Sequence, residues 1–272
     1  MKIGIIGFGN MGSVMAQNLR DYHEVFVFDK DKTKIQGLKG IAAVDNIKKL
    51  INFVDVVVLA IKPQDFENVL KGLKGLAQDK LIISIAAGVS TAHIEQVLGK
   101  IRVIRAMPNL GIKVGESVTC ICKGKFSSFE DLEFAIEDFF CYFGVVKEID
   151  EKMMNAATAI SGSGPAYIFD FLEANQTDPK NIPEHTKQDL IKRLERAAES
   201  VNFSHDDAMF LAASTATGAL ALAKIYPPGD LKKQVTSKGG TTEAALKVLA
   251  AGGNWDEAAK AALKRAEELC KI

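Results

Sequence analysis

The sequence predicts an α/β fold, with a doubly wound parallel sheet in its first half and helices alone in its second half. The runs Asp55–Ile61 and Leu81–Ala86 are almost uninterruptedly apolar, as strands are when helices cover both faces of a parallel sheet. Strand-like and helix-length segments alternate through about residue 105, which is typical of a doubly wound sheet. Beyond Glu151 strand-like runs disappear and alanine-rich helical spacing continues to the end. We therefore predict one domain of residues 1–150 and a second of residues 151–272.

Each further element follows from its own pattern of apolar residues. In the first half we expect strands at Ile3–Ile6, Glu24–Asp29, Ser117–Lys123 and Val145–Ile149, and helices at Met11–Leu19 and Ser128–Tyr142. In the second half we expect helices at Glu184–Glu199, Asp206–Lys224, Thr242–Leu249 and Asp256–Leu269. The polar stretch Gln176–Glu184, with two prolines, is expected to be an exposed loop.

The composition excludes several broad classes of protein. Lys plus Arg and Asp plus Glu number 34 each, whereas a general nucleic-acid binder needs a basic surplus. No apolar run reaches the roughly 18 residues that span a bilayer, and the N-terminus is better interpreted as a first strand than as a signal peptide. We therefore expect a cytoplasmic protein without membrane or nucleic-acid partners. The spacing of the four cysteines and four histidines predicts free thiols and no metal site.

A glycine-rich turn, Gly7-Phe8-Gly9-Asn10-Met11-Gly12, follows the first strand and opens the first helix. Gly7 permits the tight turn, Gly9 lets the backbone approach a pyrophosphate, and Gly12 allows close packing of helix on strand. The helix N-terminus then offers free N–H groups and a positive dipole end to the phosphates. A ligand-free strand–helix turn would use glycines too, but this context predicts a Rossmann-type site for a nicotinamide dinucleotide.

Asp29 bears on which dinucleotide is bound. It ends the second strand, 17 residues after Gly12, where an acid accepts bonds from the adenosine ribose hydroxyls and favours NAD. Lys30, Lys32 and Lys34 follow directly, and any of them could pair with the 2′-phosphate of NADP or simply be solvated. The sequence leaves NAD and NADP open.

Five further segments, in this order and spacing, resemble those of pyrroline-5-carboxylate reductases over nearly the whole chain. They are Ala60-Ile61-Lys62-Pro63, Ser84-Ile85-Ala86-Ala87-Gly88, Arg105-Ala106-Met107-Pro108-Asn109, Ser161-Gly162-Ser163-Gly164-Pro165-Ala166-Tyr167 and Gly239-Gly240-Thr241-Thr242-Glu243-Ala244-Ala245-Leu246. The resemblance implies reduction of 1-pyrroline-5-carboxylate to L-proline with NADPH or NADH, and a helical domain through which two subunits interlock into a homodimer or a larger assembly of dimers.

The resemblance also implies roles for individual residues. Asn46 corresponds to an asparagine that contacts the ribose, and the segments Ala60–Pro63 and Ala86–Gly88 match loops that flank the nicotinamide. Asn109 is expected to contact the cofactor. Gly240, Thr241 and Thr242 match the loop that takes the substrate carboxylate and imine nitrogen. Glu151 and Gln234 match positions near the substrate ring.

This assignment agrees with elementary chemistry. N–H groups after Gly239 and Gly240, at the start of a helix, form an anion site suited to a carboxylate, although an ordinary helix start would look similar. The Thr242 hydroxyl both donates and accepts, which suits a ring nitrogen that changes from imine to amine. With Thr242, Lys62 is the second candidate for a catalytic residue: it could hold substrate or cofactor by its charge, or be an ordinary loop lysine at the end of a strand. Because a protonated imine is already electrophilic, positioning supplies most of the catalysis.

Three departures from the family pattern keep alternatives open. Lys238 replaces a proline before the glycines, Leu110-Gly111 replaces Thr-Pro after Asn109, and residues 175–194 resemble an insertion. A reductase of another small cyclic imine or of a β-hydroxyacid is the first alternative. A nicotinamide-sensing protein without turnover is the second.

Overall fold

The computed structural model describes residues 1–270, apart from the side chain of Pro63, and contains two compact units. The first unit comprises residues 1–106 and 121–142, and the second comprises residues 107–120 and the chain from residue 143 onward. No helix in this described part of the chain is long and apolar enough to cross a membrane.

These units do not follow the single predicted boundary near Asp150, because residues 107–120 and 143–150 group with the later helices. Close backbone packing accounts for the grouping. A Cβ on Gly144 would lie 2.2 Å from the carbonyl oxygen of Ser117, and one on Gly218 would lie 2.3 Å from that of Glu116. The boundary at 150 stays a prediction about sequence-continuous domains.

Eight strands form one sheet in the order β3-β2-β1-β4-β5-β6-β7-β8, and neighbours from β3 to β6 pair in parallel. The order 3-2-1-4-5-6 is that of a doubly wound dinucleotide-binding sheet, so the predicted fold class is confirmed. The strands are β1 (Lys2–Ile6), β2 (Glu24–Phe28), β3 (Ala42–Ala43), β4 (Val56–Leu59), β5 (Leu81–Ser84), β6 (Arg102–Met107), β7 (Ser117–Lys123) and β8 (Gly144–Glu148).

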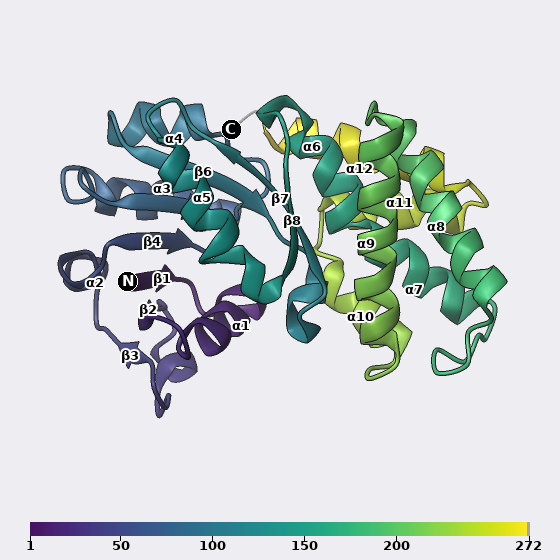
Figure 1. The fold of residues 1–272 in the computed structure, drawn as a ribbon, viewed down its shortest axis with the longest axis horizontal. Coiled ribbons are helices and arrows are strands. Elements are labelled where there is room, and N and C mark those ends of the chain that lie inside the picture. The colour runs from purple at the N-terminus through teal and green to yellow at the C-terminus, as the bar shows by residue number, and fades with distance from the viewer. Residues whose placement is uncertain (271–272) are drawn as a thin grey trace. The chain divides into compact units, whose positions relative to one another are not determined.

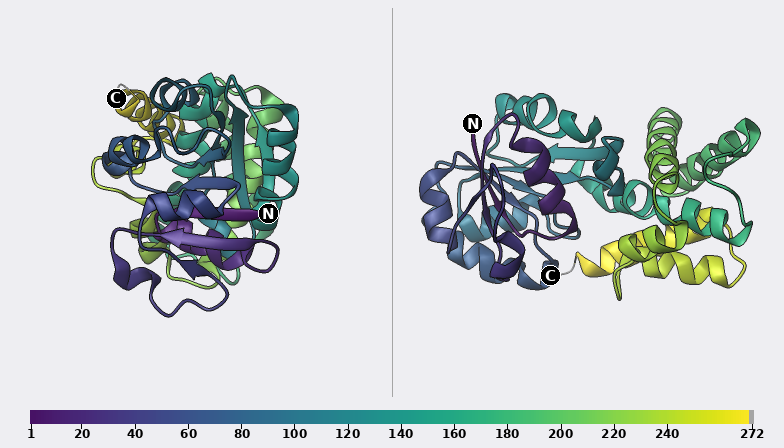
Figure 2. Two further views of the ribbon diagram at one scale, coloured as in Figure 1. Left: turned by 90° about the vertical axis from the view of Figure 1, so that its left-hand side faces the viewer. Right: turned by 90° about the horizontal axis from the view of Figure 1, so that it is seen from below.

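Helices cover both faces of this sheet within the first unit (Figures 1 and 2). One apolar cluster joins side chains of β1, β2, β4, β5 and β6 to those of α2, α3 and α4, while α1 lies on the opposite face (Figure 2). The core therefore forms a layer on each side of the strands, and the loops at the strand ends are left for binding. The helices are α1 (Asn10–Leu19), α2 (Ile47–Phe53), α3 (Pro63–Leu73), α4 (Thr91–Leu98) and α5 (Phe129–Glu137).

The structure corrects the predicted helix at Ser128–Tyr142. Ser128 caps α5 in a reciprocal pair with Asp131, but the helix ends at Glu137, and a short 3-10 turn occupies Phe140–Phe143. Strands β3 and β6 are not in our sequence assignment. Arginines interrupt the apolar pattern of β6, although Arg105 is buried there.

The second unit contains no strand after β8 in its described residues, as predicted, and its helices pack mainly on α9 and α12. The helix α9 (His205–Ala223) is apolar on nearly all sides and buries ten residues, which is typical of a central helix. A π-helical turn, Thr158–Gly162, joins α6 to α7. The remaining helices are α6 (Met154–Ala157), α7 (Gly164–Ala174), α8 (Glu184–Glu199), α10 (Pro228–Val235), α11 (Thr241–Ala250) and α12 (Trp255–Leu269).

Candidate dinucleotide and substrate sites

The glycine-rich turn lies between the end of β1 and the start of α1 in the first unit. Gly7 has φ +102°, and a Cβ there would lie 2.4 Å from the carbonyl oxygen of Ala60. A Cβ on Gly12 would lie 2.0 Å from the carbonyl oxygen of Gly7, whereas Gly9 has open space within 4 Å of that position. Only Gly9 therefore leaves room beside the backbone for a bulky ligand group.

Helix α1 begins without a competing acid. Gly9 is its N-cap, no side chain caps the helix, and its first turn has no acidic residue. The N–H groups of Asn10, Met11 and Gly12 precede the first intrahelical acceptor and remain available. This arrangement fits a pyrophosphate by charge and by shape.

Asp29 follows β2 and is tied to the glycine-rich turn. Its Oδ2 accepts from the N–H of Phe8 at 2.7 Å and its Oδ1 from the N–H of Asp31 at 2.8 Å. A backbone bond of 2.8 Å from the N–H of Gly7 to the carbonyl of Phe28 runs beside them. The two bonds to the carboxylate hold it in one orientation. The residue is also only 7% exposed.

The three lysines after Asp29 all have partners. The Nζ of Lys30 lies 2.8 Å from both carboxylate oxygens of Asp65. That of Lys32 donates to the carbonyl of Asp45 at 2.7 Å and lies 4.3 Å from the centre of the Phe28 ring. That of Lys34 lies 3.8 Å from Oδ1 of Asp29.

The other first-unit residues named from the sequence lie at carboxyl ends of parallel strands or at a helix start. Ala60–Pro63 follows β4 and Ala86–Gly88 follows β5, where ligands bind in such sheets. Lys62 is exposed at the N-cap of α3, and the side chain of Pro63 lies outside the described residues. Asn46 caps α2, because its Oδ1 accepts from the N–H of Lys49 at 2.8 Å. The capping bond leaves its Nδ2 as a donor.

Asn109 lies in the second unit and is 3% exposed. Its Oδ1 accepts from the N–H of Gly111 at 2.9 Å. A proline at position 111 has no N–H and could not donate this bond. Its Nδ2 has no partner in the described residues although it is buried. An unpaired buried amide is costly, so this donor fits an acceptor on a ligand.

The loop before α11 is braced from two sides. Gly239 has φ +70°; its N–H donates to Glu243 at 2.8 Å, and its carbonyl accepts from Nε of Arg265 at 2.8 Å. Gly240 is the N-cap of α11, and no side chain caps this helix. The first N–H groups of α11 are therefore fixed and free to bind an anion.

A chain of three hydroxyls lies at the start of α11. Oγ1 of Thr242 donates to Oγ of Ser163 at 3.1 Å, and Oγ of Ser163 lies 3.0 Å from Oγ1 of Thr241. Thr242 is 4% exposed and Ser163 is fully buried. Our sequence reasoning names the two threonines but misses Ser163, whose only signal is its place in the Ser161–Tyr167 motif.

Two further candidates also lie in the second unit. Glu151 begins a short 3-10 turn and is half-buried. The Oε1 of Gln234, near the end of α10, accepts from Nζ of Lys113 at 2.5 Å. The structure therefore uses the Gln234 amide within its own unit.

Neither of two other reactive groups in the second unit suits catalysis. Burial raises the pKa of the Cys120 thiol to about 12, so the thiolate that nucleophilic chemistry needs does not form near neutral pH. Burial also raises the pKa of Tyr167, whose hydroxyl donates to the carbonyl of Ala159 at 2.9 Å. All four cysteines are free, as predicted.

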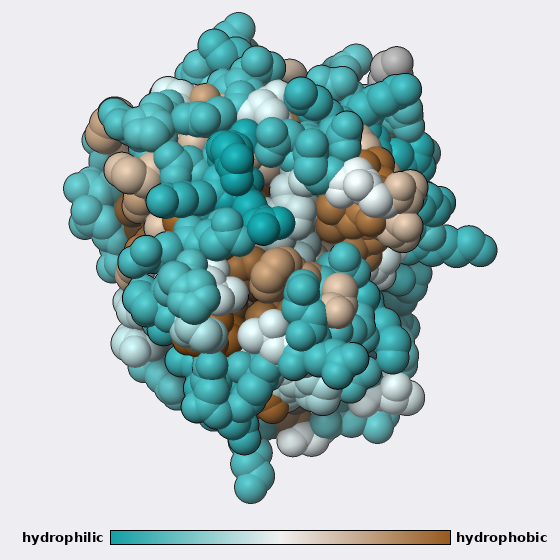
Figure 3. All heavy atoms as spheres, turned by 90° about the vertical axis from the view of Figure 1, so that its right-hand side faces the viewer, coloured by the Kyte–Doolittle hydropathy of each residue, from teal (hydrophilic) through white to brown (hydrophobic). Residues whose placement is uncertain are grey.

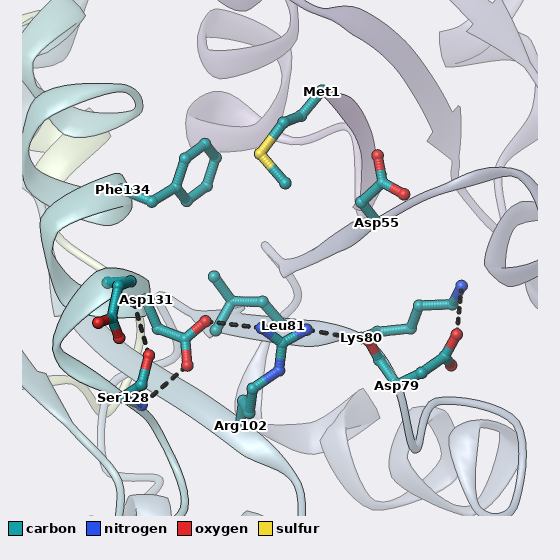
Figure 4. A pocket seen from close by; sticks show the side chains of 10 residues that line it. Met1, Asp55, Asp79, Lys80, Leu81, Arg102, Ser128, Asp131 and Phe134 are labelled. Atoms are coloured by element: carbon teal, nitrogen blue, oxygen red, sulfur yellow. Dashed lines mark hydrogen bonds and ion pairs between the residues drawn. The ribbon is translucent and has the colours of Figure 1, made fainter.

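A cavity of about 390 Å³ lies at the amino ends of β4 and β5. Figure 4 shows the side chains that line it. Asp55 precedes β4, Lys80 precedes β5, and Arg102 of β6 donates to Asp131 at 2.8 Å. This edge of the sheet is opposite the glycine-rich turn, so the cavity is not part of the dinucleotide site.

One group of side chains has the composition of a metal site. Glu195, Glu199 and His205 place one ligand atom each within 4.8 Å of one another, which the spacing of histidines does not reveal. A metal is not needed to explain this group, because Nδ1 of His205 lies 2.9 Å from Oε1 of Glu199 and the two form a hydrogen-bonded ion pair.

Two family models match the chain. Residues 2–88 match "NADP oxidoreductase coenzyme F420-dependent". Residues 151–178 and 189–269 match "Pyrroline-5-carboxylate reductase dimerisation". The second match is interrupted within residues 175–194, which the sequence analysis interprets as an insertion.

Relatives match over most of the chain. The pyrroline-5-carboxylate reductase of Aquifex aeolicus is 34% identical over 92% of this chain and 89% of its own length. That of Methanosarcina acetivorans is 35% identical over 89% and 86%. Among solved structures, the Coxiella burnetii reductase has a TM-score of 0.66 at 31% identity, covering 99% and 98%. The Plasmodium falciparum enzyme, solved with NADP bound, has a TM-score of 0.66 at 26% identity, covering 100% and 98%. The chain therefore belongs to the pyrroline-5-carboxylate reductase family.

Proposed function

We propose that this protein reduces 1-pyrroline-5-carboxylate to L-proline with NADPH or NADH. The observation that carries the proposal is the hydroxyl chain of Thr242, Ser163 and Thr241 at the uncapped start of α11. The start of this helix offers N–H groups for an anion, and the Thr242 hydroxyl beside them has its hydrogen directed to Ser163. The names of the relatives support the same reaction.

The start of α11 suits the substrate carboxylate. Its first N–H groups, at Thr241 and Thr242, have no intrahelical acceptor, and the helix dipole adds positive charge there. Glu243 does not compete for this place, since its carboxylate is bound to the N–H of Gly239. Lys238 adds a positive charge directly before the glycines.

The direction of the Thr242 hydrogen bond suits a protonated imine. Because its hydroxyl donates to Ser163, its oxygen lone pairs remain free to accept. An iminium N–H is a donor, so Thr242 would hold the proton on the ring nitrogen and orient the imine carbon. A reduced nicotinamide, when bound, supplies the hydride that this carbon accepts. The nitrogen keeps its proton and becomes the amine of proline.

The first unit suits the cofactor. The open space at Gly9 and the uncapped start of α1 would take the pyrophosphate. Asn46, whose Nδ2 is not used by the capping bond, would contact the ribose. Ala60–Pro63 and Ala86–Gly88 would border the nicotinamide. In the second unit, the unpaired Nδ2 of Asn109 would donate to an acceptor on the cofactor. Lys62, in the first unit, would hold the substrate or the cofactor by its charge. Glu151 and Gln234, in the second unit, would lie near the substrate ring.

We also propose that two copies associate through the second unit. Figure 3 shows apolar side chains gathered in patches on one face. On α9, Met209 is 50% exposed and is followed at four-residue spacing by Ala213, which is half-buried, and Thr217, which is exposed. Small residues at this spacing permit a close approach of another helix. A cytoplasmic location and a domain boundary near Asp150 remain predictions.

One assay tests the reaction. Purified protein is mixed with 1-pyrroline-5-carboxylate and either NADPH or NADH, and the loss of absorbance of the reduced nicotinamide is recorded. Oxidation of neither cofactor would refute the proposal. The changed residues Leu110-Gly111 and Lys238 favour one alternative, a different small cyclic imine or a β-hydroxyacid, which a panel of such compounds distinguishes. Cofactor binding without turnover on any of them would identify a sensor instead.

A further inference from the structure

We infer that this protein selects NADH over NADPH, and that the fixed carboxylate of Asp29 is the group that decides. The inference rests on the proposed reductase function. A relative is solved with NADP bound, so the shared fold accepts the 2′-phosphate and selectivity depends on the residues of this chain.

The carboxylate of Asp29 cannot turn away from the ribose site. It accepts from the N–H groups of Phe8 and Asp31 at 2.7 and 2.8 Å, and rotation about its side chain would break both bonds. The residue is 7% exposed, so water screens its charge poorly. An acid at this place in the fold meets the adenosine ribose.

The same carboxylate suits two ribose hydroxyls and opposes a phosphate. An ionised carboxylate offers about four acceptor positions, and two are occupied by N–H groups. The others can accept from the 2′- and 3′-hydroxyls of NADH. A 2′-phosphate near neutral pH brings close to two negative charges and no donor, so it meets repulsion without a compensating bond.

The neighbouring lysines do not offset this repulsion, because each is already paired with a group of the protein. Lys32 is bound to the carbonyl of Asp45 and packed over the Phe28 ring, and Lys34 faces Asp29 itself at 3.8 Å. Lys30 is held by both oxygens of Asp65 at 2.8 Å. That pair is exposed and therefore weak, which makes Lys30 the lysine that one substitution can release.

The test is direct binding, independent of turnover. The intact protein is titrated against NADH and against NADPH, and the fluorescence of the reduced nicotinamide gives each Kd. We expect NADH to bind at least about tenfold more tightly. Equal or tighter binding of NADPH overturns the selectivity and leaves the reductase proposal standing, whereas binding of neither cofactor overturns both.

Two variants locate the cause. Asp29→Asn keeps an oxygen for the Phe8 N–H and removes the charge, so NADPH should bind about tenfold more tightly than to the wild type. Asp65→Asn leaves the glycine-rich turn untouched and frees Lys30, so NADPH should gain roughly two- to fivefold at low salt while NADH is unchanged. An equal gain for both cofactors would contradict the role of Lys30.

A matched control removes the same charge at a distance. Asp21 is exposed just beyond the C-terminal end of α1, roughly 15 Å along the helix from the turn. Asp21→Asn should leave the ratio of the two dissociation constants unchanged. If Asp21→Asn shifts the ratio as far as Asp65→Asn does, net charge rather than Lys30 sets the selectivity.

Discussion

Replacing Thr242 by valine removes one hydroxyl and keeps the volume and branching of the side chain. The lost group donates to Ser163 at 3.1 Å in a site where Thr242 is only 4% exposed. One net hydrogen bond contributes about 1 kcal/mol to folding, so Thr242→Val should unfold at a slightly lower temperature and remain folded at assay temperature. Ser163 keeps Thr241 as a partner at 3.0 Å, so the hydroxyl chain is shortened rather than abolished.

The effect on catalysis should be larger than the effect on folding. A hydrogen bond to a charged group contributes about 1.5–3 kcal/mol, and the iminium N–H would lose such a bond. The expected fall in kcat/KM for 1-pyrroline-5-carboxylate is therefore roughly 10- to 150-fold. The dissociation constant of the reduced cofactor should change less than about twofold, since the Thr242 hydroxyl bonds only within the second unit.

Steady-state rates over a range of substrate concentrations, with cofactor binding measured separately, make the comparison. Thr177→Val is the matched control, because Thr177 lies in the polar loop after α7 and its hydroxyl has no hydrogen-bond partner in the described residues. The reasoning fails if Thr242→Val retains more than about half of the wild-type kcat/KM. It also fails if cofactor binding weakens by the same factor as kcat/KM.

Three other outcomes are expected. Arg265→Ala releases the carbonyl of Gly239, so the KM for the substrate should rise about fivefold, and an unchanged KM would exclude this bracing. Light scattering should give the wild type at least twice its 29.4 kDa chain mass; Met209→Glu should lower that mass, and a monomeric wild type contradicts the proposed interface. Lys147 holds the pKa of Asp207 below its ordinary value of 3.8 by a hydrogen bond. That stabilisation is present above pH 3.8 and is lost as the pH falls through the lower, folded-state pKa, so melting curves of Asp207→Asn and wild type should converge in acid; a constant gap would refute it.

Much of the fold is predictable because its causes are local. The uninterrupted apolar run before Ala60 is typical of a strand covered on both faces, and the φ of +102° at Gly7 favours glycine whatever its distant neighbours are. Ser128 and Asp131, three residues apart, fix the start of α5. The end of α5 has no such local cause. Phe139 and Phe140, which follow the helix, are both fully buried, and their packing depends on the whole core.

The sequence by itself determined the doubly wound sheet, the helical second half and the glycine-rich turn, because backbone geometry and the periodicity of apolar residues act over a few residues. Only the tertiary structure decided which charges and hydroxyls are free. Asp65 holds Lys30 from 35 residues away, and Thr242 donates to Ser163 across 79 residues. A hydrogen bond or ion pair needs two groups within a few ångströms, and only folding brings groups so far apart in the sequence to that distance. The proposed choice between two dinucleotides and the direction of the Thr242 hydrogen bond therefore depend on the folded chain.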